Sequence, residues 1–326
     1  MKFPKYGFAV LFSLALLLFT GWLLMDTFVI PHAYAIVTSE PTTAAASETE
    51  TETIVLIPSE SEASKQESAQ EAVTPVSASA EPVTTETSYA DDNIQVVLST
   101  YRLLNTTVYV ADVTLSSPDY LKTALAQNTY GRNITATTSS TASAVNAILA
   151  INGDYYGAQR SGYVIRNGVL YRNTSSGSED LVIYADGSFG IIDEDAVSAE
   201  ALLENGAWNV LSFGPALVEN GTVSVSVNDE VGKAMASNPR TAIGILNDGH
   251  YVFVVADGRT NESAGLSLYE LATFLQSLGV ETAYNLDGGG SSSMVFLGNV
   301  INNPTSGGRK TSERSVSDIV YIGYGA

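Results

Sequence analysis

The segment Asn285-Leu-Asp-Gly-Gly-Gly-Ser-Ser-Ser293 is the most informative stretch of this 326-residue chain. It follows a helix-like pattern over 266–278 and a strand-like run over 280–286, so Asp287 stands where a strand ends. Glycine allows left-handed backbone angles and a close approach of a ligand to main-chain N–H groups. The segment therefore predicts a loop that holds an anionic or sugar-like ligand beside a carboxylate.

Strand-like and helix-like patterns alternate over the surrounding region, residues 93–326. Asn-Gly or Asp-Gly turns between apolar runs predict hairpins around 167–168, 186–187, 220–221 and 248–249. Helices are expected at 120–127, 139–146, 198–204 and 266–278, the first because Ser117-Pro118 is a start signal. Many hairpins with a few helices predict an α+β fold with a mixed, mostly antiparallel sheet in a single globular domain.

A membrane-type segment occupies residues 1–35. Lys2 and Lys5 precede a near-continuous apolar run over 6–25, and Ala33-Tyr34-Ala35 resembles a cleavage site of small residues. The run approaches the roughly 20 residues that span a bilayer and exceeds the roughly 7–15 residues of a signal core. A signal peptide and an uncleaved anchor with its basic end inside both stay open, and the anchor is favoured. Either way, the rest of the chain is expected to be extracytoplasmic, as a secreted or membrane-anchored cell-surface protein.

The net charge of −20 is concentrated in residues 36–92, where twelve acids stand against Lys65 alone. This segment is rich in Ser, Thr, Glu and Pro and cannot bury enough apolar surface to fold, so it is predicted to be a disordered linker. Its acidity argues against nucleic-acid binding. The chain has no cysteine, which excludes disulfides and zinc–thiolate sites and favours a bacterial exported protein.

Polar, small residues end strands or open helices in four segments: 152–156, 238–241, 257–259 and 285–293. Each segment alone also fits an ordinary turn, but loops at strand ends are where sites on rigid scaffolds are built. The roughly thirty residues between Asp257 and Asp287 allow a strand–helix–strand unit that brings both acids to one sheet edge. Glu270 is a third candidate acid, although its spacing from Ser267 also fits a helix capping box.

Several other chemistries fit the sequence poorly. The two histidines, His32 and His250, lie in the membrane segment and in an expected hairpin, so a Ser-His-Asp triad is not expected. The glycines 288–290 match neither a P-loop nor a dinucleotide fingerprint. No cofactor is required, and a divalent cation bound by Asp oxygens stays open, with its ligands unknown.

The strings Asn238-Pro-Arg-Thr-Ala-Ile-Gly244, Asp257-Gly-Arg259, Leu266-Ser-Leu-Tyr-Glu-Leu-Ala272 and Asn285 to Ser292 occur in the order seen in the phosphodiester glycosidase family. The chain resembles this family over about residues 145–325. The family includes the enzyme that uncovers mannose 6-phosphate, and bacterial relatives are often labelled exopolysaccharide biosynthesis proteins. The resemblance implies cleavage between a sugar anomeric carbon and a phosphodiester oxygen. The chain departs from the family in lacking cysteine-rich additions and in having Asp154 where a small residue often stands.

This chemistry assigns expected roles to the residues. Asp287 is the first catalytic candidate, and Glu270 and Asp257 compete for the second place. Arg240 is expected to bind the phosphate, with Arg314 as a second candidate and Arg259 as a weaker one. Other expected substrate-binding residues are Thr241, Asn152, Asp154, Gly288, Gly289, Gly290 and Ser291, with Tyr155 or Tyr156 as a stacking face. The sequence thus predicts an extracytoplasmic glycosidase acting on phosphodiesters of cell-surface or exopolysaccharide glycans; the alternative is a non-catalytic module that binds glycan or sugar phosphate.

Overall fold

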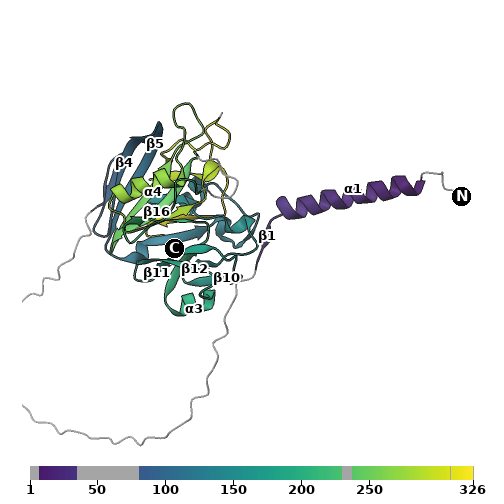
Figure 1. The fold of residues 1–326 in the computed structure, drawn as a ribbon, viewed down its shortest axis with the longest axis horizontal. Coiled ribbons are helices and arrows are strands. Elements are labelled where there is room, and N and C mark those ends of the chain that lie inside the picture. The colour runs from purple at the N-terminus through teal and green to yellow at the C-terminus, as the bar shows by residue number, and fades with distance from the viewer. Residues whose placement is uncertain (1–6, 35–80, 230–236, 309, 326) are drawn as a thin grey trace, which may run out of the picture.

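The computed structural model describes residues 7–34, 81–229, 237–308 and 310–325. Helix α1 (Gly7–Phe28) extends away from a body built mainly of sheets (Figure 1). The predicted linker lies outside the described residues as far as residue 80. From there the chain forms β2 (Val83–Thr84) and β3 (Ser88–Ala90), which pair at one edge of a sheet. The folded part therefore begins before residue 93. Its first strands lie in a segment whose acidic, polar composition resembles that of the linker.

The largest sheet has nine strands in the order β15-β14-β18-β16-β17-β5-β4-β3-β2. Its further strands are β4 (Ile94–Leu103), β5 (Thr106–Leu115), β14 (Ala216–Glu219), β15 (Thr222–Val223), β16 (Arg240–Asn247), β17 (His250–Ala256) and β18 (Thr282–Leu286). Strand β16 lies between β17 and β18 and is antiparallel to both. The chain therefore leaves β17 and β18 at the same sheet edge where it enters β16.

Two five-stranded sheets complete most of the body. One has the order β20-β19-β8-β21-β6 and the other β10-β9-β13-β11-β12. Their strands are β6 (Leu121–Leu125), β8 (Leu149–Asn152), β9 (Val164–Arg166), β10 (Val169–Arg172), β11 (Glu179–Tyr184), β12 (Phe189–Asp193), β13 (Ala207–Leu211), β19 (Met294–Phe296), β20 (Asn299–Val300) and β21 (Asp318–Ile322). A short pair joins β1 (His32–Ala33) to β7 (Gly131–Arg132). The mostly antiparallel α+β fold predicted from the hairpin signals is confirmed.

The main hydrophobic core lies between the nine-stranded sheet and the two smaller sheets. Phe253 and Leu286 of the large sheet pack in one cluster with Ile151, Leu211 and Val320 of the smaller ones. Helix α4 (Leu268–Ser277) covers the other face of the large sheet through a separate apolar cluster. The remaining helices are α2 (Thr138–Ala144) and α3 (Ala199–Glu204), with single 3₁₀ turns η1 (Pro118–Tyr120), η2 (Ala126–Asn128), η3 (Tyr156–Ala158) and η4 (Gly289–Ser291).

The helix expected over 120–127 is wrong. Ser117 does cap a turn, but this turn is the single 3₁₀ turn η1, and the chain continues as β6, paired with β21. Alternate residues Leu121, Thr123 and Leu125 of β6 are buried, which is the period of a strand. The hairpin signals are confirmed; at the first turn Asn167 and Gly168 have φ values of 50° and 75°, as a tight hairpin turn requires.

Candidate active site

A cavity of about 590 Å³ opens at the sheet edge where β16 begins and β18 ends. The described residues that line it are Tyr155, Gln159, Phe213, Asn238, Arg240, Arg259, Asp287, Gly288, Gly289 and Arg314. Three of these side chains are arginines and one is a carboxylate. Arginine pairs planar, two-pronged donors with phosphate oxygens, so the lining favours an anionic ligand beside one acid.

Asp287 is held from one side of its carboxylate. Its Oδ2 accepts hydrogen bonds from Ser291 Oγ at 2.5 Å and from Arg314 Nη2 at 3.0 Å. Arg314 also donates from Nε to Ser291 Oγ at 2.9 Å. Among the residues that the structure describes, none donates a hydrogen bond to Oδ1 of Asp287, although this residue lines the cavity. One carboxylate oxygen is thus fixed and the other is left for a ligand.

The environment of Asp287 pulls its pKa in two directions. Burial, with only 8% of the residue exposed, raises the pKa above its ordinary value of 3.8. The positive charge of Arg314 and the Ser291 hydrogen bond lower it, but burial dominates. Perturbed acids in clefts are frequent at functional sites. Asp287 is therefore a carboxylate with a raised pKa that lines the same cavity as three arginines.

Strand pairing fixes the position of Arg240 relative to Asp287. Thr241 of β16 pairs with Leu286 of the antiparallel strand β18. Arg240 precedes Thr241 and Asp287 follows Leu286, so both lie next to this pair at the same end of the two strands. Arg240 is buried, with 3% of the residue exposed, and its guanidinium donates from Nε to Leu266 O at 2.9 Å. The spacing of the acid and this arginine is therefore set by backbone hydrogen bonds rather than by loops.

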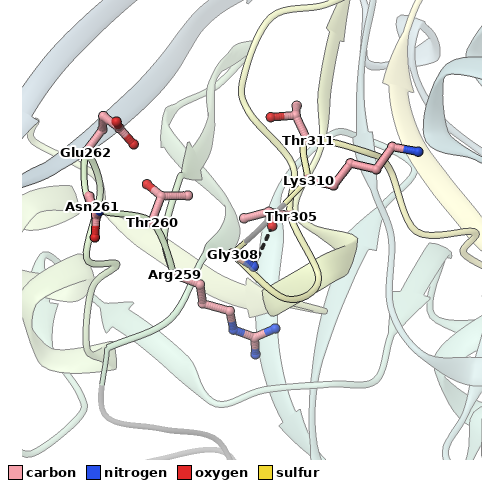
Figure 2. A pocket seen from close by; sticks show the side chains of 8 residues that line it. All are labelled: Arg259, Thr260, Asn261, Glu262, Thr305, Gly308, Lys310 and Thr311. Carbon is pink, nitrogen blue, oxygen red and sulfur yellow. Dashed lines mark hydrogen bonds between the residues drawn. The ribbon is translucent and has the colours of Figure 1, made fainter.

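Arg259 lines two cavities. It donates from Nε and Nη2 to Asn238 Oδ1 at 3.2 and 2.8 Å, and from Nη1 to Ser306 O at 3.0 Å. Figure 2 shows its guanidinium pointing away from Glu262 and from the rest of a second cavity of about 280 Å³. The described lining of that cavity is Arg259, Thr260, Asn261, Glu262, Thr305, Gly308, Lys310 and Thr311.

The glycines 288–290 mainly let neighbouring side chains pack closely against the loop, because some of its N–H groups already have partners within the protein. Gly289 has a φ of 62°, and a Cβ there would lie 2.9 Å from Arg259 Nη2. Its N–H donates to Pro239 O at 2.8 Å, and the N–H of Ser291 donates to Gly288 O. Two of the backbone N–H groups expected to bind substrate are therefore used inside the protein. A Cβ at Gly290 would lie 2.4 Å from Ser306 Oγ, which keeps this loop small.

Asn152 and Thr241 brace the loop from behind. Asn152 is fully buried and donates from Nδ2 to Asp287 O at 2.6 Å. Its Oδ1 accepts from Thr241 Oγ1 at 2.9 Å and from Ser293 N at 3.2 Å. Asn152 and Thr241, which the sequence analysis expects to bind substrate, therefore tie β8, β16 and the glycine loop together.

Asp154 belongs to a buried charge cluster. Its Oδ2 accepts from Arg166 Nη2 at 2.7 Å, and Arg166 lies 2.8 Å from Asp318 Oδ2. Burial raises the pKa of Asp318 to about 7; Asp154 adds to this rise and Arg166 opposes it. Asp154 also lines a small adjoining cavity of about 80 Å³ together with Asp287 and Arg314. The sequence patterns did not reveal this cluster, because its members come from β9, β21 and the loop after β8.

Asp257 lies at the expected sheet edge, but its carboxylate accepts hydrogen bonds from Asn302 and Asn303. Its Oδ1 accepts from Asn303 N at 2.9 Å and from Asn302 Nδ2 at 3.2 Å, and its Oδ2 accepts from Asn303 Nδ2 at 3.1 Å. Asp257 is 4% exposed and is not among the described residues that line the 590 Å³ cavity. These contacts anchor the segment after β20.

Glu270 forms the capping box that its spacing allowed. Ser267 N donates to Glu270 Oε2 at 2.8 Å, and Glu270 N donates to Ser267 Oγ at 3.2 Å. Glu270 is not part of the described cavity lining either. Of the three candidate acids, only Asp287 faces the cavity.

The aromatic lining is provided by Tyr155 and Phe213. Tyr155 is 44% exposed and lines the cavity, whereas Tyr156 is buried, with its ring stacked 5.4 Å from that of Tyr130. Phe213 and Gln159 were not singled out from the sequence, since neither belongs to a polar motif. Phe213 is positioned by its N–H, which donates to Tyr284 Oη at 2.9 Å. No group of three or more His, Cys, Asp or Glu side chains suited to a metal occurs within the described ranges.

Comparisons with known proteins agree with this geometry. A family model described as phosphodiester glycosidase matches residues 145–323. The prophage-derived uncharacterized protein YomE of Bacillus subtilis (strain 168) is 31% identical over 201 residues, covering 60% of this chain and 31% of that protein. Human N-acetylglucosamine-1-phosphodiester alpha-N-acetylglucosaminidase is 32% identical over 186 residues, covering 52% of this chain and 36% of the enzyme. The match therefore spans about a third of the length of these relatives.

Solved structures share the fold. The catalytic domain of zebrafish N-acetylglucosamine-1-phosphodiester alpha-N-acetylglucosaminidase, auto-inhibited by its pro-peptide, superposes with a TM-score of 0.56 at 23% identity, covering 71% of this chain and 83% of that one. A hypothetical protein from Synechocystis gives a TM-score of 0.55 at 15% identity, with 71% and 62% coverage. The family model covers more than half of the chain, and it includes the cavity, the glycine loop and Asp287. This protein belongs to the phosphodiester glycosidase family.

Proposed function

We propose that the protein is an extracytoplasmic phosphodiester glycosidase that hydrolyses the bond between a sugar anomeric carbon and a phosphodiester oxygen in cell-surface or exopolysaccharide glycans. The observation that carries this proposal is the cavity that Asp287 lines together with three arginines. Membership of the family, and similarity to enzymes named for action on an N-acetylglucosamine phosphodiester, support it.

Arg240, Arg259 and Arg314 would hold the phosphate. They surround the cavity, and their charges offset the negative charge that builds on the phosphate as the bond to carbon breaks. The departing phosphate monoester has a second pKa of about 6. It leaves as a stable anion and needs little protonation, so a cavity lined by one described carboxylate is sufficient for this reaction.

Asp287 would act at the sugar. Asp287 lines the cavity, where a carboxylate would stabilise the positive charge that develops on the anomeric carbon, or would activate the attacking water. Ser291 and Arg314 keep the carboxylate in place through Oδ2. Tyr155, whose ring is exposed in the cavity, offers a stacking face to the sugar.

The test is turnover by the purified protein on a panel of sugar-1-phosphodiesters. We expect free sugar and a phosphate monoester in equal amounts, and no product with Asp287→Asn. A module that only binds sugar phosphate would retain ligand binding in both proteins and release no product in either. Running the panel with and without a chelator also determines whether a divalent cation takes part.

A further inference from the structure

The end of helix α1 is built into the body of the protein. Strand β1 pairs with β7 in the register His32 to Arg132 and Ala33 to Gly131. A Cβ at Gly131 would lie 2.0 Å from His32 O, so the strands approach this closely only because residue 131 is glycine. Of the residues that resemble a signal-peptide cleavage site, Ala33 is thus part of a paired strand, and Tyr34 donates its N–H to Tyr130 O at 3.0 Å.

Side chains of the body also cap the helix. The last carbonyl groups of an α-helix have no partners within the helix. Arg132 Nη2 donates to Asp26 O at 3.1 Å, and Asn133 Nδ2 donates to Thr27 O at 3.2 Å and to Ile30 O at 3.0 Å. A cation at this end is also favourable to the helix dipole. The body therefore supplies the C-terminal cap of α1.

The helix itself has the dimensions of a membrane span. Val10–Phe28 is long and apolar enough to cross a bilayer, and none of it is buried against the body. Its 22 residues correspond to about 33 Å at roughly 1.5 Å per residue, close to the ~30 Å hydrocarbon core. Arg132 and Asn133, which cap the helix, must then lie at the membrane interface.

One residue connects this interface to the active site. Asn133, which holds Thr27 and Ile30, also lines the 80 Å³ cavity that Asp287 and Arg314 share. The small cavity lined by Asp287 therefore reaches the residue that caps the helix. If α1 spans the bilayer, this cavity lies near the membrane surface.

We propose that α1 is a retained anchor that holds the cavity at the membrane surface, and that the substrate is a glycosyl phosphodiester whose aglycone is a lipid embedded in the bilayer. This proposal rests on the proposed function. Water forms the new bond to the anomeric carbon and the bond from that carbon to the phosphate oxygen breaks. The sugar leaves with a hydroxyl group, and the phosphate monoester stays on the lipid with the second proton of the water, or releases it to solvent.

The activity test compares two substrates that carry the same sugar, using the full chain reconstituted in vesicles. One has a long polyprenyl aglycone in the same vesicles and the other a short, water-soluble alkyl aglycone. Gly131→Ala should undock β1 and lower the lipid-to-soluble rate ratio about tenfold or more. Gly21→Ala is the matched control, because a Cβ there meets nothing within 4 Å. An unchanged ratio in Gly131→Ala would overturn the proposal.

A second test is independent of activity and uses the absence of cysteine in the chain. Single cysteines would carry a fluorophore at two exposed positions. One is Arg160, next to the cavity residue Gln159, and the other is Thr100 of β4, a strand that Figure 1 shows across the body from α1. Lipids with a nitroxide headgroup should quench the label at 160 and spare the label at 100. Equal quenching would refute the orientation even if no substrate is cleaved, whereas selective quenching without turnover would count against the proposed function alone.

The mass of the purified protein provides a third test. A retained anchor leaves residues 1–35 on the chain, whereas an N-terminus at Ile36 would overturn the proposal.

Discussion

Arg314 donates from Nη2 to Asp287 Oδ2 at 3.0 Å across a separation of 27 residues. The arginine side chain is 45% exposed and the acid side chain 11%. The pair thus joins a buried carboxylate to a cation that solvent and substrate can reach. The arginine opposes the rise that burial causes in the pKa of Asp287, and its hydrogen bond occupies Oδ2 of this carboxylate.

Asp287→Asn should abolish most turnover without unfolding the protein. The amide retains the shape of the side chain but cannot stabilise a cationic sugar or accept a proton, so we expect kcat/KM to fall by about 10²- to 10⁴-fold. Kinetics on a sugar-1-phosphodiester and a thermal melt measure the two effects. Glu270→Gln is the matched control, and activity near wild type is expected because this side chain caps α4. Full activity in Asp287→Asn would contradict the assignment.

Arg314→Gln should shift the acid limb of the activity profile to higher pH. Burial raises the pKa of Asp287, whereas Arg314 and the Ser291 hydrogen bond lower it, so removing the arginine lets the pKa rise further. An acid that must be ionised loses activity as pH falls through its pKa. The variant should therefore lose activity at a higher pH than the wild type. A pH profile of kcat/KM gives the result, and a limb that stays in place would exclude Asp287 as its source.

Asp257→Asn should reduce stability more than chemistry. Its two oxygens accept three hydrogen bonds from Asn302 and Asn303, and one amide oxygen cannot replace both. Losing partners at a buried site costs about 1–3 kcal/mol, so the melting temperature should fall by several degrees. The fall in kcat/KM should be far smaller than for Asp287→Asn. Comparable losses in the two variants would restore Asp257 as a catalytic acid.

Asp180→Asn should stabilise the protein at alkaline pH. Burial, followed by the neighbouring Glu194, raises the pKa of Asp180 to about 9 from 3.8. The folded state therefore binds a proton that the unfolded state releases, and stability falls as pH rises from about 4 to about 9, at up to roughly 1.4 kcal/mol per unit. Asparagine is neutral throughout, so the gain should be largest near pH 8–9 and vanish near pH 4. Urea melts across this range provide the measurement, and a gain that does not depend on pH would contradict the shifted acid.

Local signals in the sequence predict much of the fold. Asn-Gly turns and alternating apolar residues are properties of a few neighbouring residues, and they locate hairpins such as β9–β10 correctly. Strand β6 escapes this reading because its partner β21 lies almost 200 residues further along the chain. A start signal at Ser117 and Pro118 then suggests a helix, although the tertiary pairing favours a strand.

The site shows the same division. The strand–helix–strand spacing correctly brings Asp257 and Asp287 to one edge, because β17 and β18 both flank β16. The direction of a side chain depends on partners far along the chain, which the local sequence does not reveal. Asn302 and Asn303 donate hydrogen bonds to Asp257 and so fix the direction of its carboxylate. The Arg166 cluster could not be foreseen either, since a buried ion pair leaves no local periodicity.

The hydrogen-bonded ladder beneath the cavity has a consequence for changing specificity. Arg240 opens β16 and Asp287 directly follows the paired strand β18, so the gap between this arginine and the acid is fixed by sheet geometry. Tyr155, Gln159 and Phe213 come instead from connecting segments that stand around the same opening. Substitutions at those three positions are expected to change which ligand the opening admits while the spacing of Arg240 and Asp287 is kept, which makes the rim the natural target for redesign.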